Sequence, residues 1–397
     1  MRRAASVRSV PSRRSYVPFH VPWTDHREID QVSDSIRSGW LTTGPKVHLF
    51  EERIGAMVGA RHAVAVNSCT AALHLALVVL GVKPGDEVVT SPYTFAATGE
   101  AILYLGARPV FADIDPITLN LAPEQVARAL SRRTAALLPV HIAGLPCDMA
   151  ALRAIARRRG LPVVEDAAHA LGAAVKGRPI GSLSEMTCFS FYATKNLATG
   201  EGGMVTLDDR RTAEHLRRLS LHGLSRDAWK RYTRTGSWRY DVVELGYKYN
   251  LTDVAAALGL AQLSKFRAGQ ARRRLLARRY SRLLKSHEAF DRPIEEKGNT
   301  HAWHLYILRL RPGVLRIGRD RFMALLAERG IGASVHFLPL HMHSFYRRTF
   351  GYGSGAFPIT ERESARALSL PLYPGLTRQA QDRVVETLID LADRHRR

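Results

Sequence analysis

The sequence contains few cysteines, and they are far apart. There are three, Cys69, Cys147 and Cys188, and no two of them form a Cys-x-x-Cys pair. This argues against a disulfide framework and against a cysteine-based zinc site. We therefore expect a reducing, cytoplasmic environment. Long apolar runs are also missing, since no stretch reaches the roughly 18 residues that a membrane helix needs. The sequence predicts a soluble protein without membrane insertion.

An apolar signal-peptide core is absent from the N-terminal segment. Residues 1–15 contain arginine and serine but no acidic residue. A transit peptide has this composition, and so does an unstructured basic tail. We interpret residues 1–17 as a basic flexible tail.

Acidic residues are scarce relative to basic ones. The chain has 36 Asp and Glu against 58 Lys and Arg, which gives a formal net charge of +22. A nucleic-acid-binding protein often has such a charge. Here, however, the basic residues are dispersed over expected helices such as 153–159 and 267–282, without interleaved aromatic residues or a known nucleic-acid motif. A solvated arginine-rich surface explains them, and attraction of anionic substrates or acidic partners is the alternative.

The chain is long enough for more than one core. At 397 residues with 46% hydrophobic residues, one large domain and one smaller domain are expected. Between residues 60 and 205, short apolar runs alternate with helical patterns, which predicts a doubly wound α/β fold with a mostly parallel mixed sheet. Strands are expected at 62–66, 87–90, 109–112, 135–140, 161–165, 186–190 and 203–207, and helices at 70–80, 97–105, 123–130 and 149–159.

The C-terminal part has a different pattern. Residues 251–284 form a long helical stretch with a possible break near Gly269. The segment after it predicts a small α+β unit. We divide the chain into a large cofactor-binding domain, residues 18–265, and a linking helix with a small C-terminal domain, residues 266–397. In the small domain, strands are expected at 304–310 and 334–337, and helices at 319–329 and 378–392.

A lysine and an aspartate are the residues that point most directly to chemistry. Asp166 ends the apolar run at 161–165, and Lys195 follows the run at 186–190 within an aromatic segment. Burial would lower the pKa of such a lysine and make its amine nucleophilic. Pyridoxal phosphate needs this pair, because a lysine amine binds its aldehyde and a carboxylate keeps its pyridine nitrogen protonated.

A phosphate site is expected where a strand meets a helix at Ser68, Cys69 and Thr70. Free amides, a positive dipole end and hydroxyl groups coincide there. Simple helix capping by Ser68 or Thr70 is the alternative on this segment alone. Ser190, five residues before Lys195, adds a second hydroxyl and favours the phosphate site.

Phe95 and His169 are candidate site residues only in combination with Lys195, Asp166 and the phosphate-binding residues. Phe95 follows the strand at 87–90 and offers a face for stacking on a heteroaromatic ring. His169 lies three residues after Asp166, within reach of the cofactor, although a structural histidine is the common case. The histidine clusters at 301–304 and 336–343 lack acidic ligands and a His-Glu-x-x-His pattern. We therefore expect no metal.

Four motifs resemble the DegT/StrS family of sugar aminotransferases. These pyridoxal phosphate enzymes have the aspartate aminotransferase fold (fold type I), and the resemblance covers the chain from about residue 18 onwards. The motifs are Gly-Trp-Leu-Thr-Thr-Gly-Pro at 39–45, Ser-Cys-Thr-Ala-Ala-Leu at 68–73, Glu-Asp-Ala-Ala-His-Ala-Leu-Gly at 165–172 and Ser-Phe-Tyr-Ala-Thr-Lys at 190–195.

Within the family, the chain resembles UDP-4-amino-4-deoxy-L-arabinose aminotransferases most. Segments 246–253, 301–305 and 328–332 carry this likeness. Many relatives read Gly-Tyr-Asn-Tyr-Arg where this chain has Gly-Tyr-Lys-Tyr-Asn at 246–250. Either Lys248 or Asn250 is then the residue that reaches the cofactor phosphate across a homodimer interface. Cys69 stands where relatives often have glycine or another small residue, so its backbone amide contact can survive.

The resemblance implies a role for each candidate. Lys195 would bind the cofactor aldehyde and move the proton between cofactor and sugar, while Asp166 would pair with the pyridine nitrogen. Thr70 and Ser190 would hold the phosphate, Phe95 would stack on the ring and His169 would lie beside the ring oxygen. Thr42, His336 and His341 are the candidate sugar-binding residues.

The resemblance also implies the reaction. L-Glutamate would donate its amino group and leave as 2-oxoglutarate, and a 4-keto nucleotide sugar would receive the nitrogen. A UDP-linked 4-keto-pentose is the first choice of substrate, and UDP- or dTDP-linked 4-keto-6-deoxyhexoses are the alternatives. The related sugar 3-dehydratases carry histidine in place of the lysine, so Lys195 argues against that reaction. A regulatory nucleic-acid-binding protein is the rival from another class, but the sequence shows no element that reads bases.

Overall fold

The structure is a computed structural model that describes residues 16–225 and 240–397. Most of the predicted tail, residues 1–15, therefore lies outside the described residues. Val17, at the end of that segment, is buried and pairs with Ile331.

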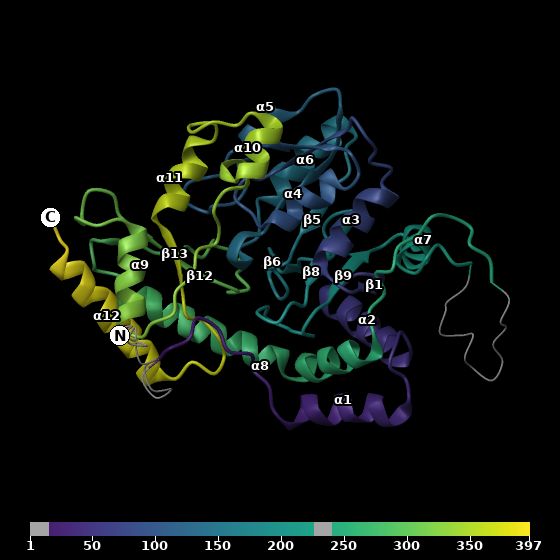
Figure 1. Cartoon of the computed structure of the whole chain (residues 1–397), viewed down its shortest axis with the longest axis horizontal. Coiled ribbons are helices and arrows are strands. Elements are labelled where there is room, and N and C mark those ends of the chain that lie inside the picture. Colours follow the sequence, from purple (N-terminus) through teal and green to yellow (C-terminus); the bar gives the residue numbers. More distant parts are fainter. Residues whose placement is uncertain (1–15, 226–239) are drawn as a thin grey trace, which may run out of the picture.

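A twisted sheet forms the centre of the larger part (Figure 1). Its strands follow the order β1-β9-β8-β5 and then β4-β2-β3, because bridges between Leu137 and Val163 and between Val140 and Asp166 join β4 to β5. The pairs β5–β8, β2–β4 and β2–β3 are parallel, whereas β9 is antiparallel to both its neighbours. The predicted mixed α/β sheet is confirmed. The strands are β1 (His62–Val66), β2 (Glu87–Thr90), β3 (Arg108–Phe111), β4 (Thr134–Leu138), β5 (Val164–Asp166), β8 (Met186–Ser190) and β9 (Gly203–Leu207).

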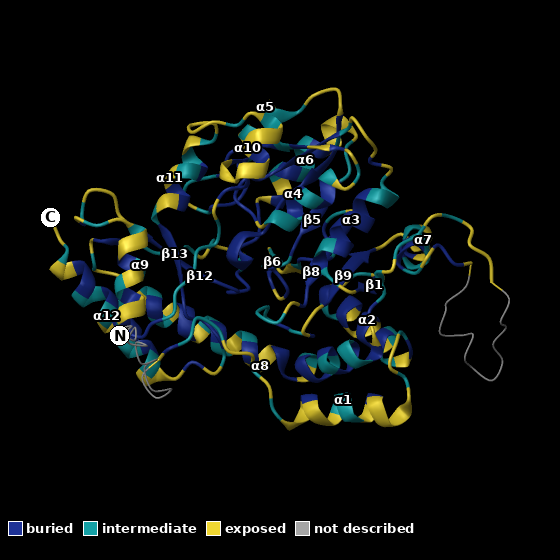
Figure 2. Cartoon of the chain, viewed as in Figure 1, coloured by how far each residue is buried: buried dark blue, intermediate teal, exposed yellow. Residues whose placement is uncertain are grey.

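Helices cover the sheet on both faces. The apolar helix α3 packs on β8 and β9, while α2 packs on β1 and is itself covered by α8, against which α1 lies (Figure 1). The sheet is therefore buried and the outer side of α1 is exposed (Figure 2). The helices of this part are α1 (His26–Ser38), α2 (Pro45–Val58), α3 (Cys69–Val79), α4 (Ala96–Leu103), α5 (Pro123–Ala129), α6 (Met149–Arg159) and α7 (Arg210–Ser220).

A second hydrophobic core lies around the antiparallel sheet β10-β12-β13. The long helix α8 (Asp253–Leu283) links the two cores, since Phe266 belongs to the first and Tyr280 to the second. The small strands β6 (Ala174–Val175), β7 (Arg178–Pro179) and β11 (Asn299–Thr300) form a separate sheet. The remaining elements are β10 (Phe290–Asp291), β12 (Tyr306–Leu310), α9 (Arg319–Glu328), α10 (Ser344–Phe350), α11 (Pro358–Arg366), β13 (Ala367–Leu370) and α12 (Arg378–Arg394).

Two predictions about the C-terminal part were wrong. Helix α8 is unbroken at Gly269; a methyl group there would come within 3.3 Å of the Trp23 ring, so the glycine serves close packing rather than a kink. Residues 334–337 form no strand, because only Ser334 pairs with Ser369 and the chain then leaves the sheet.

The first residue of α8 fixes the start of α2. The buried carboxylate of Asp253 accepts hydrogen bonds from the amides of Gly44, Lys46 and Val47 at 2.8, 3.1 and 2.9 Å. These amides have no partners within their own helix, and a carboxylate at a helix N-terminus is stabilising. The loop at residues 39–44 is thereby held against α8. Among the described residues, no helix is both long and apolar enough to cross a membrane.

Candidate active site

Neighbouring strand ends bring the two key residues together. Asp166 is the last residue of β5, and it lies opposite Cys188 of the parallel strand β8. Ser190 ends β8, and the chain then turns so that the Lys195 amide donates to the Tyr192 carbonyl at 2.8 Å. The carboxyl ends of parallel strands meet at one edge of a sheet, which is where ligands bind in such folds.

Asp166 is buried and held by hydrogen bonds on both oxygens. Its Oδ2 accepts from the Thr98 hydroxyl at 2.7 Å, and its Oδ1 accepts from the Ala168 amide at 3.1 Å. Because Thr98 donates to Asp166, the bond of 2.7 Å between Thr98 and Thr94 has Thr94 as its donor. Burial raises the pKa of Asp166. A carboxylate in this position is stabilised by a cation that comes close to it.

The amine of Lys195 is electrostatically linked to Asp166. Lys195 is partly accessible to solvent. Burial nevertheless lowers its pKa to about 8, although Cys69 and Asp166 act to raise it. A lysine with this pKa has a substantial neutral fraction near neutral pH. The amine can therefore act as a nucleophile and can hold or release a proton.

This pKa gives a direct prediction for the cofactor-free protein. Labelling of Lys195 by acetic anhydride should rise with pH and reach half its maximum near pH 8, because only the neutral amine reacts and the pKa is about 8. Mass spectrometry of the labelled peptides measures this. Labelling of the exposed Lys83 in the same sample shows that the reagent is active, and a half-point for Lys195 above about pH 9 would contradict the prediction.

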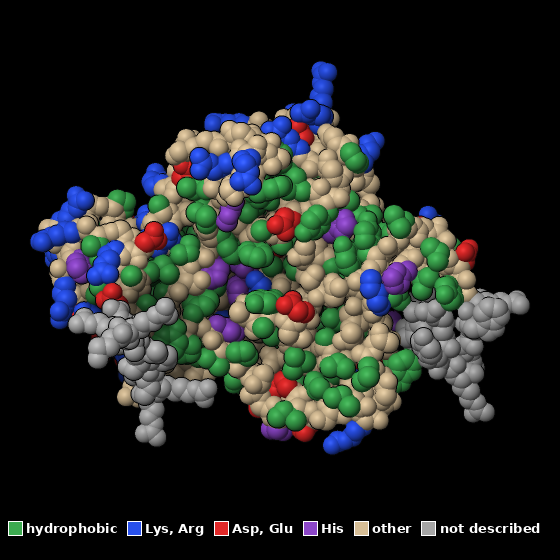
Figure 3. All heavy atoms as spheres, viewed as in Figure 1, with side chains coloured by type: hydrophobic (Ala, Val, Ile, Leu, Met, Phe, Trp, Pro, Cys, Tyr) green, Lys and Arg blue, Asp and Glu red, His purple; other side chains and the backbone are tan. Residues whose placement is uncertain are grey.

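Histidines gather around Lys195. The pKa values of His169 and His304 lie well below the usual value, chiefly through burial and also through the charge of Lys195. Their rings are 4.4 Å apart, and the ring of Phe337 stacks on His169 at 5.8 Å. Both imidazoles are therefore neutral. Figure 3 shows histidine side chains close together near the centre of this face.

The tautomer of His304 is set by its neighbours. The Asn196 amide nitrogen donates to Gln270 at 3.0 Å and to the Ala302 carbonyl at 2.8 Å. Its oxygen lies 3.2 Å from Nδ1 of His304 and can only accept, so that nitrogen carries the proton. Within the described part of the chain, the buried Nδ1 of His169 has no partner. A polar atom left in this state suits a ligand that supplies the missing hydrogen bond.

The predicted phosphate site lies at the start of α3. Ser68 is the N-cap, with its hydroxyl accepting from the Ala71 amide at 3.1 Å, so the capping interpretation is correct as far as it goes. Cys69 and Thr70 open the helix, where first-turn amides have no helical partner. Gly203 packs so closely that a methyl group there would lie 2.4 Å from the Ser68 carbonyl. The site thus combines capping with free donors for an anion.

Three further candidates lie around this edge. Phe95 precedes α4 and is 62% exposed, with its ring 6.0 Å from that of Phe337. The amine of Lys248 donates to Asn250 at 2.6 Å, and Asn250 donates to the Thr43 hydroxyl at 2.8 Å. Asn250 therefore contacts the loop that contains the exposed Thr42, and Lys248 is joined to that loop through Asn250. Within one chain, Lys248 and Asn250 are bonded to each other.

The two histidines proposed for the sugar have different surroundings. His336 bonds to Ser369 at 2.9 Å, and its pKa is lowered to about 4 by burial and by the charge of Lys195. It belongs to the group around the lysine. His341 is buried, bonds to Glu361 at 3.0 Å and contacts the ring of Phe357. Its contacts are those of a structural residue.

Sequence reasoning did not identify Thr98, Asn196 or His304 as parts of the site. Thr98 lies within a helix that starts after Phe95, and its contact with Asp166 spans 68 residues. His304 comes from a segment whose histidines were examined only for metal binding. Asn196 directly follows Lys195, and this adjacency is the only signal in the sequence that marks it. Within the described ranges, no group of three or more His, Cys, Asp or Glu side chains is arranged to hold a metal ion.

The residues present fit pyridoxal phosphate. Asp166 offers a buried carboxylate for a protonated ring nitrogen, and Lys195 offers an amine of lowered pKa. The helix α3 N-terminus offers donors for a phosphate. The unpartnered Nδ1 of His169 offers a hydrogen bond to a ring substituent. Each chemical group of the cofactor thus has a counterpart.

Comparisons with known proteins point to the same cofactor. The sequence model of the DegT/DnrJ/EryC1/StrS aminotransferase family matches residues 22–389. The chain is 48% identical over 385 residues to the spore coat polysaccharide biosynthesis protein SpsC of Bacillus subtilis, covering 96% of this chain and 98% of that protein.

Solved structures are similar over nearly the full length. A putative sugar aminotransferase, Spr1654 from Streptococcus pneumoniae, in its PMP form superposes with a TM-score of 0.90 at 33% identity, covering 95% of this chain and 99% of that one. DesI, solved in the presence of its TDP-sugar product, gives a TM-score of 0.86 at 34% identity, with 96% and 93% covered. The Streptococcus pneumoniae protein is also known in a PLP form, with a TM-score of 0.89 at 33% identity, covering 96% of this chain and 99% of that one.

Proposed function

Because the chain belongs to the DegT/DnrJ/EryC1/StrS aminotransferase family, whose members are pyridoxal phosphate-dependent enzymes, we propose that it transfers the amino group of L-glutamate to the keto carbon of a nucleotide-linked sugar. The observation that carries this proposal is the pairing of Lys195 and Asp166 at neighbouring strand ends. The charges of the two groups influence each other's pKa.

The bound cofactor supplies an electron-withdrawing ring that stabilises negative charge on the carbon that loses a proton. The chain's own residues do the rest. Lys195 holds the aldehyde and moves the proton, because its lowered pKa lets it take up and release one near neutral pH. Asp166, fixed by Thr98 and Ala168, would pair with the protonated ring nitrogen. Thr70 and Ser190 bind the phosphate, and Phe95 and His169 orient the ring.

The sugar is the less defined part of the proposal. A UDP-linked 4-keto-pentose remains the first choice, and the motifs at 246–253, 301–305 and 328–332 support it. A dTDP- or UDP-linked 4-keto-6-deoxyhexose is the second, because DesI, which is 34% identical, was solved with a TDP-sugar product. His336 stands in the group around Lys195 and is the residue best placed to contact either sugar; Thr42 is a more peripheral candidate.

The purified protein, loaded with cofactor, should form about one equivalent of 2-oxoglutarate per site from L-glutamate alone, and should form it continuously only when a suitable keto sugar takes up the amino group. A panel of UDP- and dTDP-linked 4-keto sugars ranks the substrates by kcat/KM. Mass spectrometry of the product detects the added amino group. If no member of the panel yields an amino sugar while the cofactor is bound, the proposed substrate class is wrong.

A homodimer is a further part of the proposal. Val242, Val243 and Leu245 are 59%, 53% and 88% exposed and follow one another in the segment before Lys248. Adjacent exposed apolar side chains of this kind mark interaction surfaces. A second copy of the chain that covers them would bring Lys248 and Asn250 towards the neighbouring cofactor phosphate.

The prediction is that light scattering gives about twice the chain mass of 44.2 kDa, and that Val243→Asp/Leu245→Asp gives monomers with little turnover. The reason is that a charged group cannot be buried in an apolar interface without a large cost. Leu275→Asp, at a 58% exposed position on α8, is the control and should leave mass and turnover unchanged. A fully active monomeric double variant would refute the shared site.

A further inference from the structure

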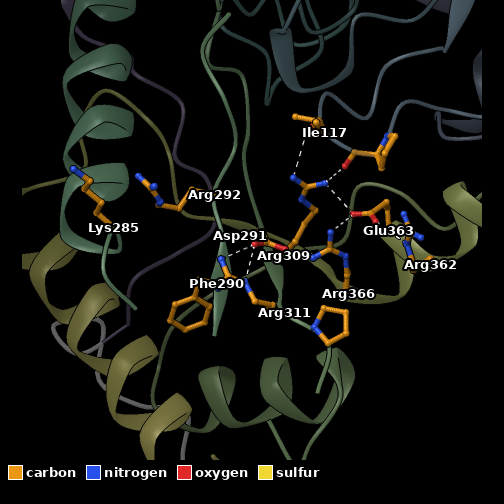
Figure 4. Close-up of a pocket in the computed structure, with 12 residues that line it drawn as sticks. Ile117, Lys285, Phe290, Asp291, Arg292, Arg309, Arg311, Arg362, Glu363 and Arg366 are labelled. Atoms are coloured by element: carbon orange, nitrogen blue, oxygen red, sulfur yellow. Dashed lines mark hydrogen bonds and ion pairs between the residues drawn. The ribbon is translucent and has the colours of Figure 1, made fainter. Parts of the chain in front are cut away.

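A second hollow lies in the C-terminal part, away from the residues around Lys195. Its volume is about 610 Å³. It is bounded by β10, by β12 and the residues that directly follow it, by α11 and by the turn at 116–117 (Figure 4). This volume is in the range of small-molecule sites. None of its lining residues belongs to the active site described above. Its cationic lining residues are Lys285, Arg292, Arg309, Arg311, Arg362 and Arg366.

The lining has more positive than negative charge. Six cationic side chains face two carboxylates, those of Asp291 and Glu363, which leaves an excess of four positive charges. Concave surfaces lined by one sign of charge concentrate the field and attract ions of the opposite sign. The hollow is therefore strongly positive even after its internal ion pairs are counted.

Both carboxylates form ion pairs with arginines on one wall of the hollow. Glu363 is buried and pairs with Arg309 at 2.9 Å and with Arg366 at 2.5 Å. Asp291 pairs with Arg311 at 3.0 Å and with Arg366 at 2.6 Å. Figure 4 shows these groups pointing toward one another. They form a connected network that holds the arginines in place.

The opposite wall lacks such partners. Lys285 follows the end of α8 and is exposed, and Arg292 follows β10 and is half-buried. Arg292 donates to the Ser281 carbonyl at 2.7 Å, which orients its guanidinium without neutralising it. Across the described ranges, neither residue has a carboxylate partner. Figure 4 shows both cations on the side of the hollow away from Glu363 and Arg362.

We propose that this hollow binds a small anion with two linked phosphate groups. Arginine is suited to phosphate because its planar fork makes paired hydrogen bonds. Two phosphate groups carry roughly three negative charges near neutral pH, by analogy with phosphorylated side chains. That charge is about one less than the excess of four positive charges in the lining. Lys285 and Arg292 are the residues that bind the ligand, and Arg311 faces it from the other wall.

Pyrophosphate is the probe, measured by isothermal titration calorimetry on the cofactor-loaded enzyme so that the cofactor phosphate site is filled. The expected result is saturable binding that Lys285→Ala/Arg292→Ala weakens at least tenfold. Inorganic phosphate should bind at least tenfold more weakly than pyrophosphate. Titrations with UDP and dTDP show whether the ligand is a diphosphate alone or a nucleotide. If both bind as tightly as pyrophosphate, the diphosphate alone is recognised. If they bind more tightly and the double variant loses this binding, the ligand is a nucleotide.

The matched control is Arg267→Ala/Arg282→Ala. Both residues are exposed on α8, the helix that ends just before Lys285, and neither lines the hollow. Their removal should change the affinity for pyrophosphate less than twofold. Equal losses in both double variants would mean diffuse attraction to the net charge and would overturn the proposal, as would the absence of saturable binding by the unaltered enzyme. Lys285→Ala alone, at an exposed position, provides the same comparison if the double variant folds poorly. Transamination by both variants should remain unchanged.

Discussion

Replacing Lys195 with alanine is expected to abolish amino transfer, with kcat falling by at least about a thousandfold, in line with the loss of a group that is both nucleophile and proton carrier. Burial lowers the pKa of Lys195 to about 8, and its charge acts on Asp166 and on the neutral His169 and His304. The near-visible absorbance of the lysine-bound cofactor should disappear at the same time. Turnover and absorbance spectra of the purified variant measure the two effects.

The control for this change is Lys83→Ala, which removes an exposed lysine from a loop and should leave both the spectrum and the rate intact. Reduction with borohydride followed by peptide mapping identifies the amine that carries the cofactor in the unaltered enzyme. A persistent absorbance band in Lys195→Ala, or a label on another lysine, would place the covalent link elsewhere.

Replacing Asp166 with asparagine should lower kcat/KM by at least about a hundredfold, an effect of the size found when preorganised charge stabilisation is removed. The amide has nearly the same shape, so its oxygen can accept from the Ala168 amide while its nitrogen donates to the Thr98 hydroxyl, which then donates to Thr94. It has no negative charge to keep a ring nitrogen protonated. The loss should therefore appear in the chemical step more than in cofactor binding. Steady-state kinetics at saturating cofactor separate the two.

Stability provides an independent readout for the same variant. Burial raises the pKa of Asp166 in the folded chain, so above the unfolded pKa the charged form disfavours folding of the cofactor-free protein. Asp166→Asn should then have a melting temperature no lower than that of the cofactor-free parent. Asp30→Asn, at an exposed position on α1, is the control for a change of one charge. A strongly destabilised Asp166→Asn would show that the carboxylate is mainly structural.

Much of the central sheet was predictable because its signals are local. The strands at 62–66, 87–90, 186–190 and 203–207 have the predicted bounds, and α6 begins and ends as expected. Short buried apolar runs between helical patterns leave few other arrangements. No comparable local signal marks α1 or α11, whose positions depend on distant contacts such as that of Asp113 with the Thr360 amide at 2.9 Å. The predicted strand at 334–337 failed because alternation alone does not show where a chain leaves its sheet.

The site was predictable to the extent that its residues lie at strand ends. Lys195, Asp166 and Ser190 follow directly from the pattern of runs and their carboxyl ends. The residues that set the state of these groups come from elsewhere in the chain: Thr98 fixes Asp166, and Asn196 fixes the tautomer of His304. Hydrogen bonds of this kind join residues separated by 68 and 108 positions, and periodicity contains no information about them.

The close approach of Gly203 to Ser68 has a consequence for redesign of the enzyme. Any side chain at position 203 would meet the backbone of Ser68 and Cys69, with contacts of 2.4 and 2.6 Å already for a methyl group. Backbone cannot give way as a flexible side chain can, so variant libraries aimed at new sugars should leave this glycine untouched. Diversity belongs instead around His336, whose neighbours are the side chains of Ser369, Phe19 and Phe337.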